Sequence, residues 1–149
     1  MSNKVIVYTD GGSRGNPGPS ALGIVIVTSE EGEDIFGKNK KERSYSEYLG
    51  VKTNNEAEYE AVVFALKKLK QLLGKKNTNE VGVEIRTDSE LMYSQINGLY
   101  KIKEPSLQKF FVEIWNLKQD FKNVFFKHIP REENKLADKL VNIELDKSS

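Results

Sequence analysis

Lys4–Gly12 reads KVIVYTDGG, and the rest of the fold can be worked out from this stretch. Lys4–Thr9 is β-branched and apolar on both faces, which predicts a buried strand. The strand runs directly into Asp10. The segment DGGSRGNPGPS that begins there consists mainly of Gly, Pro, Asn and Ser, which are typical of loops. We therefore expect Asp10 to stand at the exit of a buried strand.

Four further strands are predicted from apolar or alternating segments bounded by turn residues: Leu22–Thr28, residues 33–48, Val81–Thr87 and Val124–Ile129. Residues 33–48 alternate only loosely and are rich in charge, so we expect that strand to be the more exposed one. Val81–Thr87 resembles the first strand, because it too runs directly into an aspartate, Asp88.

Helical spacing of apolar residues predicts helices between these strands. The clearest opens at Thr53-Asn54-Asn55 and carries one stripe of residues: Glu58, Ala61, Val62, Ala65, Leu66 and Leu69. Three more are expected at about Ser89–Ile96, Ser106–Asp120 and Lys135 to about Leu145, with a loose tail at 146–149. This order predicts an α/β fold in a single domain, 1–149. We expect a five-stranded mixed sheet, its first three strands antiparallel, flanked by helices.

The composition excludes several kinds of site. The chain of 149 residues has no cysteine and one histidine, His128, so thiolate sites and disulfides are excluded and a histidine-rich zinc site is disfavoured. A metal would be held by oxygen, which suits magnesium, manganese or calcium. No apolar run approaches the ~20 residues of a membrane span. We expect a cytoplasmic monomer that does not engage a membrane.

Four carboxylates are placed so that they could converge. Asp10 and Asp88 follow buried strands, and sites in such sheets form where adjacent strands end. Glu58 heads the apolar stripe of its helix and should face the sheet, while Asp138 lies at the edge of a helical packing face. Buried carboxylates without partners are costly. Four of them at one point would repel each other unless divalent cations neutralised them, so the pattern predicts a metal site.

Each acid also has a purely structural interpretation. Asp10 could begin a glycine-rich turn. Glu58 stands three residues after Asn55, which is the spacing of a capping box. Asp88 could be a helix N-cap, and Asp138 an ordinary surface acid. The placing of all four together favours the site over these alternatives.

Four motifs give the chain a resemblance to type 1 ribonuclease H over roughly residues 3–143: YTDGG with GNPGP (8–12 and 15–19), TNNEAE (53–58), TDS (87–89) and PREEN with AD (130–134 and 137–138). The first two are highly specific as a pair. The resemblance implies an endonuclease that hydrolyses the RNA strand of RNA–DNA hybrids with two Mg²⁺ ions, for which Mn²⁺ is a possible substitute. It implies 5′-phosphate and 3′-hydroxyl products.

The resemblance also implies a role for each acid. Asp10 and Asp88 would be the central metal ligands, with Asp10 bridging the two ions. Glu58 would bind one metal and approach the RNA 2′-hydroxyl, and Asp138 would complete the site and help to release product.

Polar loop residues are implied to contact the hybrid: Gly11, Gly12, Asn16, Thr53, Asn54 and Asn55. The glycines would let the backbone approach the RNA, the asparagines would contact the minor groove and sugars, and Thr53 would hold a DNA phosphate. Such recognition depends on 2′-hydroxyls and helix shape, so little sequence preference is expected. The same residues also suit turns and helix caps.

Two departures from the family pattern alter the expected mechanism. Many members carry a catalytic histidine before the last aspartate, whereas His128 falls inside a predicted strand and is interpreted as structural. Arg131 is the candidate to take its place, through electrostatics alone. The basic helix that some relatives insert is reduced to residues 97–105, where Lys101 and Lys103 could grip the DNA backbone. No separate N-terminal hybrid-binding domain is expected, so binding should be weaker and more salt-sensitive.

Other functions stay open at this point. One is a nuclease of the same fold that acts on double-stranded RNA or RNA–DNA junctions. Another is a nucleic-acid-binding module without catalysis. Four acids facing phosphate would bring such a module no benefit, which favours the nuclease.

Overall fold

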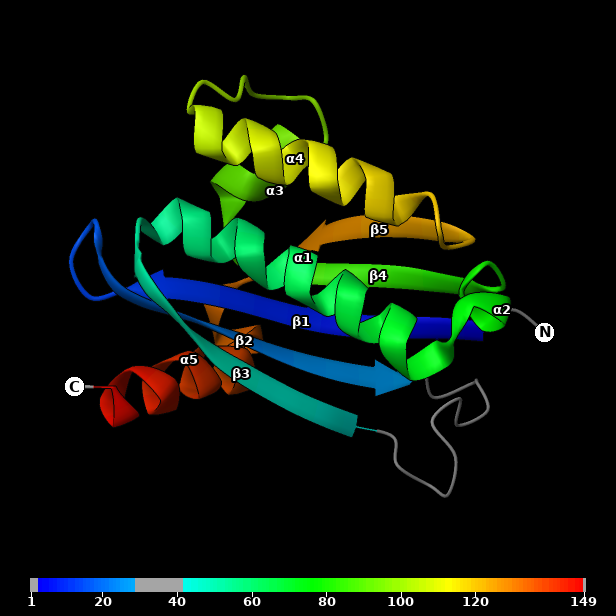
Figure 1. Cartoon of the computed structure of the whole chain (residues 1–149), viewed down its shortest axis with the longest axis horizontal. Helices are drawn as coiled ribbons and strands as arrows, with labels where there is room; N and C mark the ends of the chain where they lie inside the picture. Colours follow the sequence, from blue (N-terminus) through cyan, green and yellow to red (C-terminus); the bar gives the residue numbers. More distant parts are fainter. Residues whose placement is uncertain (1–2, 29–41, 149) are drawn as a thin grey trace.

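A computed structural model of the chain describes residues 3–28 and 42–148. The elements follow in the order β1 (Asn3–Ser13), β2 (Gly18–Thr28), β3 (Glu42–Lys52), α1 (Asn54–Leu73), α2 (Lys75–Thr78), β4 (Val81–Thr87), α3 (Glu90–Ile96), α4 (Pro105–Lys118), β5 (Asn123–His128), the 3₁₀ turn η1 (Arg131–Glu133) and α5 (Lys135–Lys147). One sheet has the strand order β3-β2-β1-β4-β5, with helices packed against it (Figure 1).

The strand directions are those predicted. β1, β2 and β3 are antiparallel neighbours, whereas β4 is parallel to both β1 and β5. The two strands that run into aspartates are therefore adjacent and point the same way. This arrangement confirms the mixed sheet and brings Asp10 and Asp88 to one region of it.

The prediction that β1 ends at Thr9 is wrong. β1 continues to Ser13, and Asp10 lies inside the paired region opposite Gly23. The glycines after Asp10 do not break the strand, because β2 begins at Gly18 and supplies pairing partners for them. Local loop preference is thus outweighed by the hydrogen bonds of the neighbouring strand. The loop shrinks to residues 14–17.

β3 is also displaced from its prediction. The strand runs from Glu42 to Lys52 rather than over 33–48, and residues 33–41 lie outside the described residues. Its last residues extend beyond the predicted end because Val51 and Lys52 pair with Pro19 and Gly18 at the start of β2.

The core lies between the sheet and α1. All six residues of the predicted stripe are buried, which confirms that this face of α1 packs on the sheet. α4 packs on α1 through Leu107, Ile114 and Leu117. α1 stops at Gly74, whose φ of 77° suits glycine, and the short α2 that follows was not predicted.

α5 packs against β1, β2 and β3, and Figure 1 shows it away from α1. Its apolar residues Val141 and Leu145 cluster with Ala21 of β2. The helix runs to Lys147, two residues into the segment expected to be loose, and Asp146 forms a 2.7 Å ion pair with Arg14. No helix in residues 3–28 and 42–148 is long and apolar enough to cross a membrane.

Candidate active site

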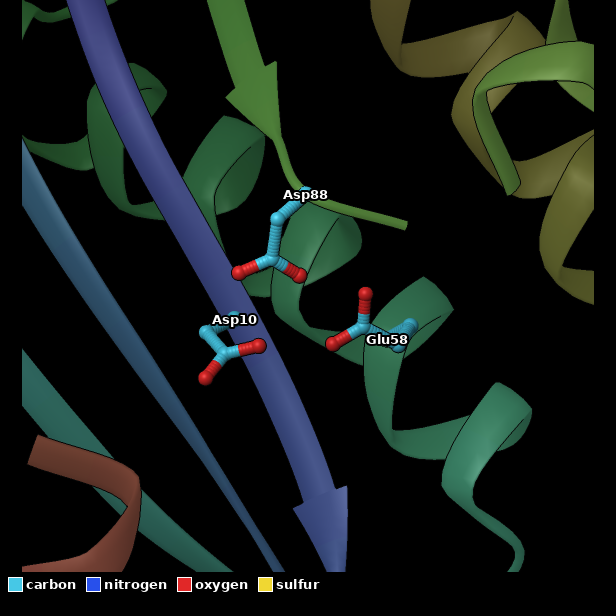
Figure 2. Close-up of side chains that lie close together, drawn as sticks. All are labelled: Asp10, Glu58 and Asp88. Carbon is cyan, nitrogen blue, oxygen red and sulfur yellow. The ribbon is translucent and has the colours of Figure 1, made fainter. Parts of the chain in front are cut away.

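Three carboxylates from distant parts of the chain meet beside the central strands. Asp10 comes from β1, Asp88 from the residue after β4, and Glu58 from the early part of α1 (Figure 2). One carboxylate oxygen from each lies within 4.8 Å of the other two. Parallel pairing of β1 with β4 places the two aspartates, and the packing of α1 brings in the glutamate.

Glu58 is held by the backbone of β1. The amide of Gly11 donates a 2.6 Å hydrogen bond to Glu58 Oε1, and the side chain is only 4% exposed. A Cβ added at Gly11 would lie 2.2 Å from the carbonyl oxygen of Ala57, so glycine is what allows α1 to come this close. The missing side chain of Gly11 thus serves the helix contact, and its proposed contact with RNA stays a prediction.

The interpretation of Glu58 as a mere helix cap is wrong. The capping box of α1 is formed by Thr53 and Glu56: Thr53 Oγ1 accepts from the Glu56 amide at 3.1 Å, and Glu56 Oε1 accepts from the Thr53 amide at 2.8 Å. Glu58 is therefore free of any capping role and points toward Asp10 and Asp88 (Figure 2).

Asp88 is likewise not the cap of α3. That position belongs to Ser89, whose Oγ accepts from the Met92 amide at 3.2 Å. Asp88 Oδ2 instead accepts a 3.1 Å hydrogen bond from Asn134 Nδ2. The Asp88 side chain is directed into the carboxylate cluster, as the metal-site prediction requires.

Asn134 is a residue whose importance sequence reasoning missed. In the sequence it stands directly before the last predicted helix, a position typical of a cap, yet its side chain makes no capping hydrogen bond. It is 1% exposed, and its Nδ2 also donates to the carbonyl of Thr9 at 2.9 Å. The main-chain carbonyl of Asn134 accepts from the amide of Asp138 at 3.1 Å. Its place in the motif PREEN, four residues before Asp138, was the available signal.

Asp138 and Arg131 line the same cavity, of about 480 Å³, as the three clustered acids. Asp138 is half-buried and lies close enough for its charge to raise the pKa of Asp10. Arg131 is exposed on η1. The structure therefore brings together all four acids and the arginine that the sequence singled out.

Burial and mutual repulsion shape the acidity of the cluster. Burial, together with the charges of Asp88 and Asp138, raises the pKa of Asp10 to about 7, although a hydrogen bond from Glu58 opposes the shift. Burial and the charge of Asp10 also raise the pKa of Glu58. Ionising both is costly because the neighbouring charges are negative. A divalent cation would remove that cost, and an all-oxygen donor set fits Mg²⁺ or Mn²⁺.

The polar residues at one side of the cavity are linked to each other. The amide of Asn54 donates to Asn16 Oδ1 at 2.9 Å, and Asn54 Oδ1 accepts from the Ser13 amide at 3.3 Å. These bonds join the turn at 14–17 to the start of α1, next to Thr53 and Asn55. Gly12 and Asn54 both line the cavity.

The remaining candidates lie elsewhere. Lys101 and Lys103 are exposed in the segment between α3 and α4 and are not among the residues that line the carboxylate cavity. His128 ends β5 opposite Thr87, and its exposed ring lies 5.9 Å from that of Tyr93. His128 is not among the residues that line the carboxylate cavity, and its structural role stays a prediction.

Comparison with known proteins adds independent findings. The family described as "Reverse transcriptase-like" matches residues 8–143. Ribonuclease HI of Halobacterium salinarum is 34% identical over 96% of this chain and 65% of its own length. The bifunctional protein Rv2228c of Mycobacterium tuberculosis is also 34% identical, and this chain spans 36% of its length. The solved structure of LC11-RNase H1 with an RNA/DNA hybrid is 43% identical, covers 97% of this chain and 98% of its own, and has a TM-score of 0.84.

Proposed function

The chain belongs to the type 1 ribonuclease H family, and we propose on this basis that it is a metal-dependent endonuclease that hydrolyses the RNA strand of RNA–DNA hybrids. The observation that carries the proposal is the convergence of Asp10, Glu58 and Asp88 within 4.8 Å. That LC11-RNase H1, a relative matched along almost its whole length, was solved with an RNA/DNA hybrid supports the choice of substrate.

Asp10, Glu58, Asp88 and Asp138 would hold two Mg²⁺ ions, with Mn²⁺ as a possible substitute. Bound there, the ions supply activation of water for in-line attack and stabilisation of the departing 3′-oxygen. The Gly11 amide orients Glu58, and Asn134 orients Asp88, so these acids are set before substrate arrives. The products would carry 5′-phosphate and 3′-hydroxyl ends.

Arg131 would place a fixed positive charge in the same cavity as the acids. A guanidinium stays protonated at any usable pH, so it cannot accept a proton. Its contribution would be attraction of the negative charge on the departing phosphate, where many relatives use histidine. Asp138, half-buried in this cavity near Arg131, would complete the metal site and assist product release.

Recognition of the hybrid would fall to the polar turn and helix start beside the acids: Gly11, Gly12, Asn16, Thr53, Asn54 and Asn55. The hydrogen bond from the Asn54 amide to Asn16 Oδ1 links the turn to the start of α1. Lys101 and Lys103 would contact the DNA backbone from the segment between α3 and α4. We further propose that the enzyme acts in the cytoplasm as a monomer.

A cleavage assay tests the proposal. Labelled RNA–DNA hybrid, double-stranded RNA, an RNA–DNA junction and double-stranded DNA are each incubated with the protein and Mg²⁺ or Mn²⁺, beside an Asp10→Asn variant. We expect the hybrid to be cut and the variant to lose activity by on the order of 10³-fold or more. An intact hybrid under both metals would refute the proposal. Preferential cutting of double-stranded RNA or junctions would assign the chain to the other nuclease class.

A further inference from the structure

The segment 97–104, which joins α3 to α4 at the top of Figure 1, contains no helix or strand but has a closely fixed backbone. Its first part folds back on α3. The amides of Leu99 and Tyr100 both donate to the carbonyl of Ser94, at 2.8 and 3.2 Å, around Gly98 with its φ of 78°. The segment also carries Lys101 and Lys103.

Two glutamine side chains, one from each flanking helix, hold the middle of this segment. Gln95 Nε2 on α3 donates to the carbonyl of Lys101 at 3.1 Å. Gln108 Nε2 on α4 donates to the carbonyl of Ile102 at 2.8 Å. Two successive main-chain carbonyls are thus each bonded by a side chain of a different helix, which restrains the path of the chain between Lys101 and Lys103. We call Gln95 and Gln108 the glutamine clamp.

Gln95 is itself oriented from α1. Tyr59 Oη donates a 2.6 Å hydrogen bond to Gln95 Oε1, and the two side chains are 1% and 5% exposed. Because the amide oxygen is engaged by Tyr59, the amide nitrogen faces Lys101. Burial and the charge of Glu104 raise the pKa of Tyr59, so its hydroxyl keeps its proton and remains a donor. Tyr59 directly follows Glu58 in the sequence.

We propose that Tyr59, Gln95 and Gln108 are positioning residues for hybrid binding, which hold Lys101 and Lys103 at a fixed place relative to the carboxylate cluster. The inference rests on the proposed function and adds to it the device that orders the lysine segment. Exposed lysines on a loose loop would lose conformational entropy on contacting phosphate, whereas a preordered loop loses less. The glutamine clamp would thereby let this short segment bind the hybrid, a role for which some relatives insert a basic helix.

Kinetics on the RNA–DNA hybrid with Mg²⁺ test the proposal with Gln95→Met, Tyr59→Phe and Gln108→Leu. Each should raise KM by about three- to tenfold and leave kcat within about twofold, because ordering of a binding loop is lost but the acids stay in place. Gln119→Leu is the matched control: Gln119 lies at the opposite end of α4, is also exposed, and its Nε2 donates to the carbonyl of Trp115 at 3.1 Å. It should change neither constant.

The decisive comparison repeats these changes in a Lys101→Ala, Lys103→Ala background. If the glutamine clamp acts through the lysines, the clamp substitutions have no further effect on KM in this background. An equal increase of KM in both backgrounds, or a loss of kcat instead, would overturn the inference. Limited trypsin digestion gives a readout without substrate: cleavage after Lys101 or Lys103 should be faster in Gln108→Leu than in Gln119→Leu, and equal rates would also overturn it. A wild-type protein that leaves the hybrid intact would instead refute the proposed function.

Discussion

The side-chain amide of Asn134 donates to Asp88 Oδ2 at 3.1 Å across 46 positions of sequence. The same nitrogen donates to the carbonyl of Thr9, the residue before Asp10. One buried amide therefore fixes two of the clustered aspartates relative to each other, and its helix carries Asp138 one turn later. Four predictions follow from this geometry and its surroundings.

Asn134→Ala should lower kcat on the hybrid by about 10- to 100-fold, because an outer partner that orients a metal-binding acid is lost. It should also destabilise the fold by about 1–3 kcal/mol, since the Thr9 carbonyl loses its buried donor. Steady-state kinetics and urea unfolding measure the two effects. Asn77→Ala is the control. Asn77 Nδ2 donates to the carbonyl of Leu73 at 2.9 Å, at the C-terminal end of α1 and away from Glu58. Unchanged turnover in Asn134→Ala would show that Asp88 needs no such support.

The metal-free protein should lose stability as the pH rises from 5 to 8. Folding raises the pKa of Asp10 from 3.8 to about 7. Between these values the folded protein keeps a proton that the unfolded chain has released, so the free energy of unfolding falls with rising pH and the penalty is complete above about pH 7. The raised pKa of Glu58 acts in the same direction.

Urea unfolding at pH 5 and pH 8 in the presence of a chelator measures this penalty, which we expect to be on the order of 1–3 kcal/mol. Asp10→Asn should reduce the pH dependence and be more stable than wild type at pH 8. Millimolar Mg²⁺ should restore stability to wild type at pH 8, because it binds the ionised cluster of the folded state. Greater stability of the metal-free wild type at pH 8 than at pH 5 would contradict the raised pKa of Asp10.

Gly11→Ala and Gly12→Ala should differ sharply although the two positions are adjacent. A Cβ at Gly11 would lie 2.2 Å from backbone atoms of Ala57, whereas one at Gly12 would meet its nearest neighbour, Val141 Cγ1, at 3.5 Å. We expect Gly11→Ala to cost about 3 kcal/mol or more by displacing α1. Gly12→Ala should leave thermal stability nearly unchanged. Comparable melting temperatures for the two variants would show that α1 can be displaced with little loss of stability.

Arg131→Ala should reduce kcat on the hybrid by about tenfold or more if the guanidinium attracts charge in the transition state. Arg131→Lys should recover part of the rate, because it retains the charge but not the planar fork. The exposed position of Arg131 means that neither change should affect stability, which circular dichroism melts would check. Turnover unaltered in the alanine variant would remove Arg131 from the mechanism.

The sequence predicted those parts of the structure that are specified by local pattern. The stripe headed by Glu58 placed that side chain on the sheet, because helical periodicity alone determines which face is buried. The bounds of β4 were also predicted, since the β-branched residues of Val81–Thr87 alternate with Gly82, Glu84 and Arg86 and the segment ends at Asp88. The convergence of Asp10 with Asp88 followed from the two strands being neighbours.

The parts that escaped prediction depend on partners far away in sequence. β1 continues past Asp10 only because β2 pairs with its glycines, and no local sequence pattern predicts that pairing. Asn134 resembles an ordinary helix cap until its neighbours Thr9 and Asp88 are known. The contact of Tyr59 with Gln95 is hidden for the same reason, because a helical pattern does not reveal which distant residue a buried hydroxyl will bond.

The four acids come from β1, α1, the end of β4 and α5, which is the last element of the chain. If they act together as proposed, catalytic capacity appears only when the final helix has docked. A ribosome-bound chain that lacks α5 would hold three of the acids and still be unable to finish the site. Enzymatic activity would then report the docking of α5, and its recovery during refolding should coincide with that step rather than with formation of the sheet.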